Sequence, residues 1–125
     1  MNVVEGLFYT SDHEWLKVEG NIGYIGVTDF AQGELGDIVF ISIESSVSEI
    51  VKGETFGTIE AVKTVADINA PVSGKLIEVN AKLENDPQLV NSDPYGEGWI
   101  VKIELTNLDE TKELMDAEAY KAQLG

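Results

Sequence analysis

The chain of 125 residues contains no cysteine and no arginine. Without cysteine it has no disulfide framework, no thiolate metal site and no cysteine nucleophile. Without arginine it lacks the planar guanidinium group that grips carboxylates and phosphates through two parallel hydrogen bonds. Its 8 lysines are opposed by 23 aspartates and glutamates, which leaves a net charge of −15. This balance argues against nucleic acid as a partner, because such binding depends on cationic contacts to phosphate.

Long apolar segments are also absent, since no run approaches the ~20 residues needed to cross a bilayer. The first residues, Met1–Gly6, have neither the basic start and apolar core of a signal peptide nor the arginines of a transit peptide. We therefore expect no membrane association and a cytoplasmic location of the bacterial type. The length suits one domain, so we expect a single domain over residues 1–125.

Most of the remaining sequence predicts short β-strands separated by glycine-rich turns, a pattern typical of sandwiches and barrels. The predicted strands cover residues 8–10, 13–19, 22–27, 38–43, 75–79 and 99–105, with a hairpin at about 56–71. Thr28 is a candidate N-cap for a short helix over residues 29–35. Asn107 and Glu110 have the spacing of a capping box, so we expect a C-terminal helical segment at about 107–124. The polar residues 44–49 predict a surface loop.

Lys63 stands out because it lies in the predicted hairpin, where Glu60 and Asp67 are the only other charged residues. A lysine among β-branched residues either extends its charge past its neighbours or lies where the strand turns outward. One interpretation is an ordinary solvated lysine. The other is a modification site, because acylating the amine removes the charge and leaves a long tether. A stiff hairpin tip would hold the base of that tether, and we expect Val62 and Val65 to anchor its sides.

Signatures of catalysis and metal binding are few. His13 stands beside Glu14, and a histidine–carboxylate pair can transfer protons, but no nucleophile or second histidine accompanies it. The acidic residues lack the spacing of an EF-hand. The glycines at 20, 23 and 26 lack the spacing and the basic residue of a phosphate-binding loop. We therefore expect neither an enzyme nor a metal site.

The hairpin, with Gly53–Gly57 before it and Pro71–Gly74 after it, is similar to the lipoyl-lysine hairpin of lipoyl carrier domains. From about Phe8 to Leu124 the chain more closely resembles the H-protein family of the glycine cleavage system. The resemblance depends on five motifs in this order: His13–Trp15, Gly26–Ala31, Leu35–Val39, Val90–Trp99 and Asp116–Tyr120. It implies a mainly β fold, a barrel-sandwich hybrid of two small sheets with short helices and a C-terminal helical segment.

The resemblance also implies a function. Lys63 would carry covalent lipoic acid, and lipoate-attaching enzymes would read Glu60. The protein would be a monomeric carrier and not an enzyme. Its arm would take an aminomethyl group from glycine decarboxylase (P protein) to the tetrahydrofolate-dependent aminomethyltransferase (T protein), and dihydrolipoamide dehydrogenase (L protein) would reoxidise the dithiol. A cleft would shelter the loaded arm, with four candidate residues: Glu14, Asp67, His13 and Asp12.

The sequence departs from the family's common pattern near the lysine. Ala61 and Thr64 replace the usual serine and alanine, and Ala70 stands where serine is frequent. A biotin carrier would have methionines beside the lysine, but Val62 and Thr64 flank it here. Two alternatives stay open: an H-like protein that passes its lipoyl group to other lipoyl domains or serves another pathway, and an unmodified acidic docking module in which Lys63 is merely solvated.

Overall fold

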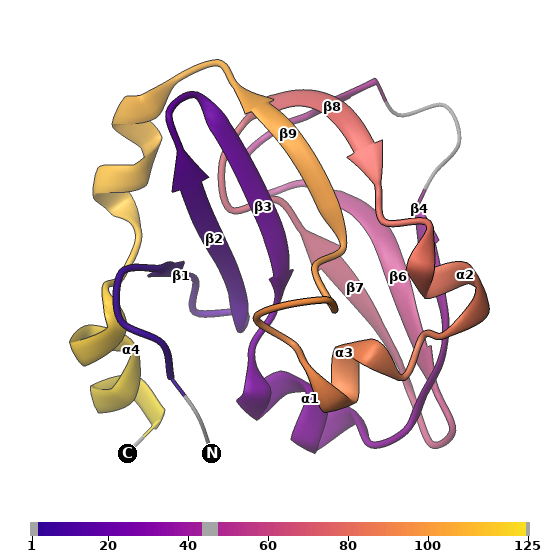
Figure 1. Cartoon of the computed structure of the whole chain (residues 1–125). Helices are drawn as coiled ribbons and strands as arrows, with labels where there is room; N and C mark the ends of the chain where they lie inside the picture. Colours follow the sequence, from indigo (N-terminus) through magenta and orange to yellow (C-terminus); the bar gives the residue numbers. More distant parts are fainter. Residues whose placement is uncertain (1–2, 44–47, 125) are drawn as a thin grey trace.

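The structure is a computed structural model, and it describes residues 3–43 and 48–124. Most of the predicted polar loop over residues 44–49 lies outside the described residues, as do residues 1, 2 and 125. The described part forms two antiparallel sheets (Figure 1). Their strands are β1 (Phe8–Tyr9), β2 (Glu14–Glu19), β3 (Ile22–Val27), β4 (Ile38–Ile43), β5 (Glu49–Ile50), β6 (Thr55–Ala61), β7 (Val65–Asn69), β8 (Gly74–Val79) and β9 (Val101–Leu105).

The larger sheet has the strand order β1-β2-β3-β9-β8-β5, and the smaller has the order β4-β6-β7. The smaller sheet contains the long hairpin β6–β7, whose turn lies at the lower edge of Figure 1. A single large core cluster includes buried residues of both sheets, such as Leu16, Ile25, Ile38, Ile59 and Ile103. Every second residue of β9 is buried and packs into this core, because successive side chains of a strand point to opposite faces of the sheet.

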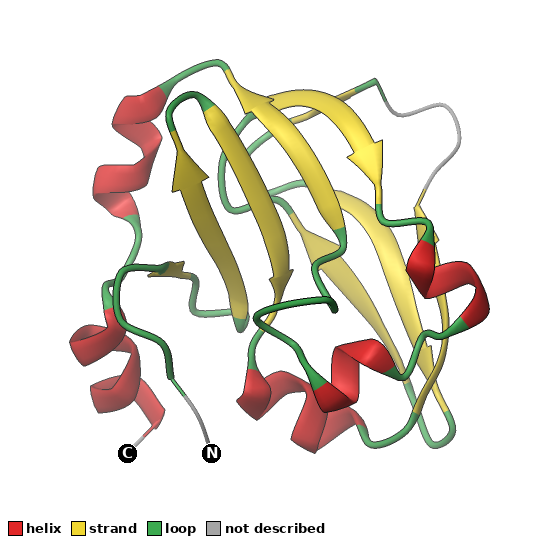
Figure 2. Cartoon of the chain, viewed as in Figure 1, coloured by secondary structure: helices red, strands yellow, loops and turns green. Residues whose placement is uncertain are grey.

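Short helices flank the sheets (Figure 2): α1 (Asp29–Leu35), α2 (Lys82–Asn85), α3 (Leu89–Ser92), a 3₁₀ helix η1 (Leu108–Glu113) and α4 (Ala117–Leu124). The predicted cap of α1 is confirmed, because the Thr28 hydroxyl accepts a hydrogen bond from the Ala31 N–H at 3.2 Å. Within the described residues no helix is long and apolar enough to span a membrane. Together the sheets and helices confirm the predicted mainly β fold class.

The predicted capping box at Asn107 is only half correct. The Asn107 side chain does accept from the N–H of Asp109, as a cap should. The Glu110 carboxylate, however, accepts from the backbone N–H of Ser73 at 2.7 Å and from its hydroxyl at 3.1 Å. Glu110 therefore ties the C-terminal segment to the turn after β7. Its carboxylate binds Ser73, a partner that the fold brings near, in place of the local backbone N–H that a capping box would use.

A second apolar cluster attaches α4 to the outside of the larger sheet. Tyr9, Trp15, Ala117 and Tyr120 are all buried in it. Figure 1 shows α4 beside β1, next to the N-terminal segment. The chain's last helix is therefore fixed against its first strands, close to the loop that holds His13.

Candidate functional site

Lys63 lies in the tight turn that joins β6 to β7. The N–H of Ala61 donates to the carbonyl of Thr64 at 2.8 Å, which closes the turn. The N–H of Val62 donates to the carbonyl of Asp37 at 3.0 Å, which fastens the tip to the segment before β4. Lys63 itself is exposed. The backbone of the tip is thus held at two points, while Lys63 as a whole stays exposed.

The prediction that Val62 and Val65 anchor the tip is wrong. Val62 is 75% exposed and Val65 is 62% exposed, so neither packs into the core. Backbone hydrogen bonds do the anchoring instead. The Lys63 side chain lies over Gly36, where a built Cβ atom would come within 3.2 Å of Lys63 Cε. Glu60 is exposed and stands directly opposite Val65 in the sheet register.

A cleft of about 460 Å³ lies between α1, the loop after β1 and the hairpin. We call it the arm cleft. The structure brings all four predicted cleft residues together in its lining, which consists of Asp12, His13, Glu14, Val27, Phe30, Ala31, Glu34, Leu35, Ile59, Ala66 and Asp67. Leu35 of this lining precedes Gly36, over which the Lys63 side chain lies. The outer part of the Lys63 side chain therefore lies next to the C-terminal end of α1, the helix that forms one wall of the arm cleft.

Glu14 is the buried acid of the arm cleft, with only 3% of its surface exposed. Its carboxylate accepts from the Thr10 hydroxyl at 2.7 Å and from the Asn69 N–H at 3.3 Å. Burial raises the pKa of Glu14 from 4.5 to about 7, because desolvation of the charge outweighs these two hydrogen bonds, and Asp12 adds to the rise. A carboxyl group with such a pKa near neutrality responds strongly to any charge placed beside it.

The other three predicted residues differ in exposure. Asp67 and Asp12 are exposed, and Asp12 accepts from the Asn69 side-chain amide at 3.4 Å. His13 is half-buried and its ring packs on Phe30 with centroids 4.5 Å apart. Burial lowers the pKa of His13 against the opposing pull of Asp12 and Glu34. With Glu34 of α1, which is also exposed, the arm cleft thus combines one buried acid, three exposed acids and an imidazole whose neutral form is favoured.

The residues that α1 contributes to the arm cleft were not among those predicted from the sequence. Phe30, Ala31, Glu34 and Leu35 form one wall of the arm cleft. Their spacing puts them on one side of a helix, so periodicity would group these residues. Nothing local in the sequence says that this side of the helix borders the lysine hairpin, because that depends on how the two sheets close.

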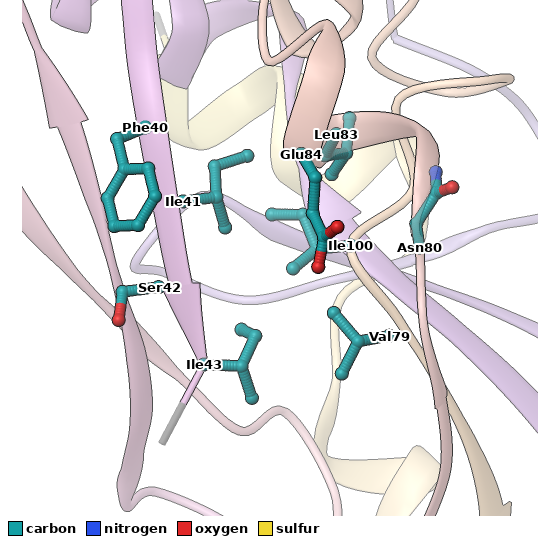
Figure 3. A pocket seen from close by; sticks show the side chains of 9 residues that line it. All are labelled: Phe40, Ile41, Ser42, Ile43, Val79, Asn80, Leu83, Glu84 and Ile100. Atoms are coloured by element: carbon teal, nitrogen blue, oxygen red, sulfur yellow. The ribbon is translucent and has the colours of Figure 1, made fainter. Parts of the chain in front are cut away.

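A second hollow, of about 500 Å³, lies between the edge strand β4 and the segment of β8 and α2. Figure 3 shows Ile41 and Ile43 directed into it, toward Val79 and Ile100, while Phe40 points away on the other side of β4. Among the described residues that line it, Glu84 is the only charged one. The hollow is therefore mainly apolar, and it shares no lining residue with the arm cleft.

No group of three or more His, Asp or Glu residues in the described part of the chain has an arrangement that could hold a metal ion. What the site offers is an exposed lysine on a turn held by backbone hydrogen bonds, beside a cleft with an apolar wall and carboxylates. These features suit a covalently tethered group better than a freely diffusing ligand.

Residues 7–125 match the sequence profile of the glycine cleavage H-protein family. The chain belongs to this family. It is 52% identical over 122 residues to the glycine cleavage system H protein of Bacteroides thetaiotaomicron, a match that covers 98% of this chain and 97% of the relative. The H protein of Symbiobacterium thermophilum is 54% identical over 121 residues, covering 97% and 94% of the two chains.

A solved structure gives the same result. The crystal structure of a glycine cleavage system H protein from Mycobacterium marinum has a TM-score of 0.89 and 35% identity, covering 98% of this chain and 99% of that one. The glycine cleavage H proteins are lipoyl carriers that bear the cofactor covalently on a lysine, and they are not catalysts. The protein is therefore a carrier that works with the other components of glycine cleavage.

Proposed function

We propose that Lys63 is the lysine that carries the lipoyl group, and that residues 1–125 act as one monomeric carrier domain in the cytoplasm. In this proposal glycine decarboxylase loads the carrier, the tetrahydrofolate-dependent aminomethyltransferase unloads it, and dihydrolipoamide dehydrogenase reoxidises it. The observation that supports this assignment is the position of Lys63 at the exposed tip of the β6–β7 hairpin, next to the arm cleft.

The other lysines fit this role less well. Within the described residues, five of the eight lysines form ion pairs, and Lys63 is not among them: the paired lysines are Lys17, Lys52, Lys82, Lys112 and Lys121. Lys75 and Lys102 lie within the strands β8 and β9, and not in a turn. An attaching enzyme needs an amine that it can enclose, and the hairpin tip presents one. Exposed Glu60 lies on the strand that leads to the tip, where such an enzyme can read it.

When bound, the lipoyl group supplies a dithiolane that is opened to carry the aminomethyl group on sulfur. The residues of this chain have three tasks toward it. Lys63 holds the base of the tether through an amide at Nζ. Phe30 and Leu35 in the cleft wall limit the access of water. Glu14 and Asp67 stabilise the protonated amine, because a carboxylate interacts strongly with a cation where water is partly excluded.

The attachment site is tested by intact-mass measurement after incubation with lipoate, ATP and a lipoate-attaching enzyme. We expect the parent and the matched control Lys52→Arg to gain one lipoyl group and Lys63→Arg to gain none, since a guanidinium group does not form the amide. Because Lys63 is exposed, its substitution should change the free energy of unfolding by no more than about 0.5 kcal/mol. A lipoylated Lys63→Arg variant would reject the assignment and direct attention to Lys52 or Lys75.

The sheltering role is tested by the lifetime of the aminomethylated protein in the absence of the transferase. We expect Glu14→Ala and Asp67→Asn to release ammonia and formaldehyde faster than the parent, while both are still lipoylated. Asp109→Asn is a matched control, because it removes an exposed carboxylate that lies outside the cleft lining. Equal release rates in all four proteins would reject the sheltering role of these two acids.

A further inference from the structure

The hydroxyl of Tyr120 links three distant segments behind the arm cleft. Tyr120 belongs to α4 and is fully buried, with its ring stacked on Tyr9 at 4.6 Å between centroids. Its oxygen lies 2.7 Å from Nδ1 of His13 and 2.7 Å from Oγ1 of Thr28. His13 lines the arm cleft, and Thr28 caps the helix that forms its wall. Through one oxygen the C-terminal helix therefore contacts a residue that lines the arm cleft and the N-cap of the helix that forms its wall.

The donor and acceptor in each hydrogen bond of the series Thr28–Tyr120–His13 follow from the other hydrogen bonds that these atoms make. Oγ1 of Thr28 accepts from the N–H of Ala31 at 3.2 Å, so its own hydrogen is available for donation. Among the described residues its remaining hydrogen-bond partner is the Tyr120 oxygen. If Thr28 donates to Tyr120, the phenolic hydrogen is directed to Nδ1 of His13. The hydroxyls of Thr28 and Tyr120 then each have an acceptor, and His13 is neutral with its proton on Nε2.

We propose that Tyr120 is a positioning residue for the arm cleft: by donating to Nδ1 it holds His13 in the neutral tautomer that carries its proton on Nε2. This inference depends on the proposed function, because it assigns His13 a place in sheltering the arm. A neutral His13 leaves the negative charge of Glu14 and Asp67 available to a protonated amine in the arm cleft. An imidazolium in the same lining would repel that amine.

The neutral tautomer of His13 needs the hydrogen bond from Tyr120 because the groups around the ring act in opposite directions. Asp12 in its own loop and Glu34 of α1 both favour the charged imidazolium, whereas burial and the donation from Tyr120 favour the neutral ring. The backbone of His13 has φ of +69°, a conformation uncommon for a side-chain-bearing residue. It is held by a hydrogen bond from the His13 N–H to Thr10 and one from the Thr28 N–H to the His13 carbonyl. The ring is thus fixed at its base as well as at Nδ1.

The chain offers a matched pair of variants and a simple readout. His13 is the only histidine, so its NMR signals need no assignment. Tyr120→Phe removes the hydroxyl that contacts His13. Tyr9→Phe removes the other hydroxyl of the same ring stack, which instead bonds to the backbone of Val4.

In the unloaded full-length protein we expect Tyr120→Phe to raise the pKa of His13 by about 0.4–1 pH unit, because a hydrogen bond that favours the neutral ring is lost. Tyr9→Phe should leave it unchanged. Nitrogen-15 shifts of the parent at pH 8 should show the proton on Nε2, a measurement that needs no variant. A proton on Nδ1 in the parent, a fall of the pKa in Tyr120→Phe, or equal shifts in both variants would overturn the proposal.

The link to the carrier role has its own test. With the loaded protein we expect release of the aminomethyl group to be faster in Tyr120→Phe than in Tyr9→Phe, with equal lipoylation of the two. Equal release from both would overturn the positioning role. Failure of Lys63 to be lipoylated would instead reject the proposed function, and the NMR titration of the unloaded protein would still report the tautomer. The two failures are therefore distinguishable.

Discussion

Replacing Glu14 with glutamine should remove a pH dependence of stability that burial builds into the fold. Glutamine has nearly the shape of the protonated carboxyl group. Its carbonyl oxygen can accept from the Asn69 N–H, and its amide can donate to the Thr10 hydroxyl, so both partners of Glu14 keep a hydrogen bond. The main change is that the side chain at position 14 no longer ionises.

The magnitude follows from the pKa of Glu14, which rises from 4.5 to about 7. At about 1.4 kcal/mol per pH unit this rise corresponds to about 3 kcal/mol. The fold binds the proton more tightly than the unfolded chain does. The stabilisation is therefore complete below pH 4.5 and is lost as the pH rises to about 7. Because the side chain is only 3% exposed, solvent screening reduces this effect little.

The assay is urea unfolding of the parent and of Glu14→Gln at pH 5, 6, 7 and 8. Both proteins share every other titrating group, so the difference between their free energies of unfolding isolates residue 14. We expect the parent to lose stability relative to the variant by about 2–3 kcal/mol between pH 5 and pH 8. If the difference between the two free energies of unfolding stays constant within about 0.5 kcal/mol over this range, the conclusion that burial raises the pKa of Glu14 is refuted.

Four further predictions concern stability and are measured by thermal or urea unfolding. Gly74→Ala should reduce the free energy of unfolding by about 1–3 kcal/mol, because the new Cβ would lie 2.7 Å from a backbone oxygen of β9. Gly53→Ala should reduce it by about 1 kcal/mol, because Gly53 has open space around it but a φ of +84°. Parent-like stability of either variant would contradict the reason given for that glycine. Val62→Ser should change stability by less than about 0.5 kcal/mol because Val62 is exposed, and a larger loss would show that it does anchor the tip. Trp15→Phe should cost about 1–3 kcal/mol, since it removes the buried 3.0 Å hydrogen bond to the Pro94 carbonyl, and a neutral result would place that carbonyl in contact with water.

Several features of the site could be predicted from local sequence alone. The β-branched residues around Lys63 predict strand structure with a lysine that extends outward or lies at a turn, and the resemblance to lipoyl carrier domains adds the hairpin, which β6 and β7 form. Thr28 is a polar N-cap followed by an acidic first turn, a signal that depends on neighbouring residues only. Such features need no distant partner, so periodicity and capping chemistry suffice to find them.

Local rules failed where a distant contact replaced a near one or where an expected burial did not form. Glu110 has the spacing of a capping box but bonds to Ser73, 37 residues away in the chain. Val62 and Val65 are β-branched apolar residues, for which a buried position in a strand is expected. The hairpin tip extends beyond the core, however, and leaves both exposed to solvent. Burial depends on which surfaces meet, and the identity of a side chain does not reveal that.

The chemistry of the arm cleft belongs to the tertiary structure. The sequence by itself determined which residues are acids, which lysine stands alone and which family the chain resembles. It did not determine that Glu14 is buried or that α1 forms a wall beside it. Nor did it pair His13 with Tyr120, which is 107 residues away. A pKa and a tautomer are set by desolvation and by hydrogen-bond partners, and both exist only once the two sheets and the last helix have packed together.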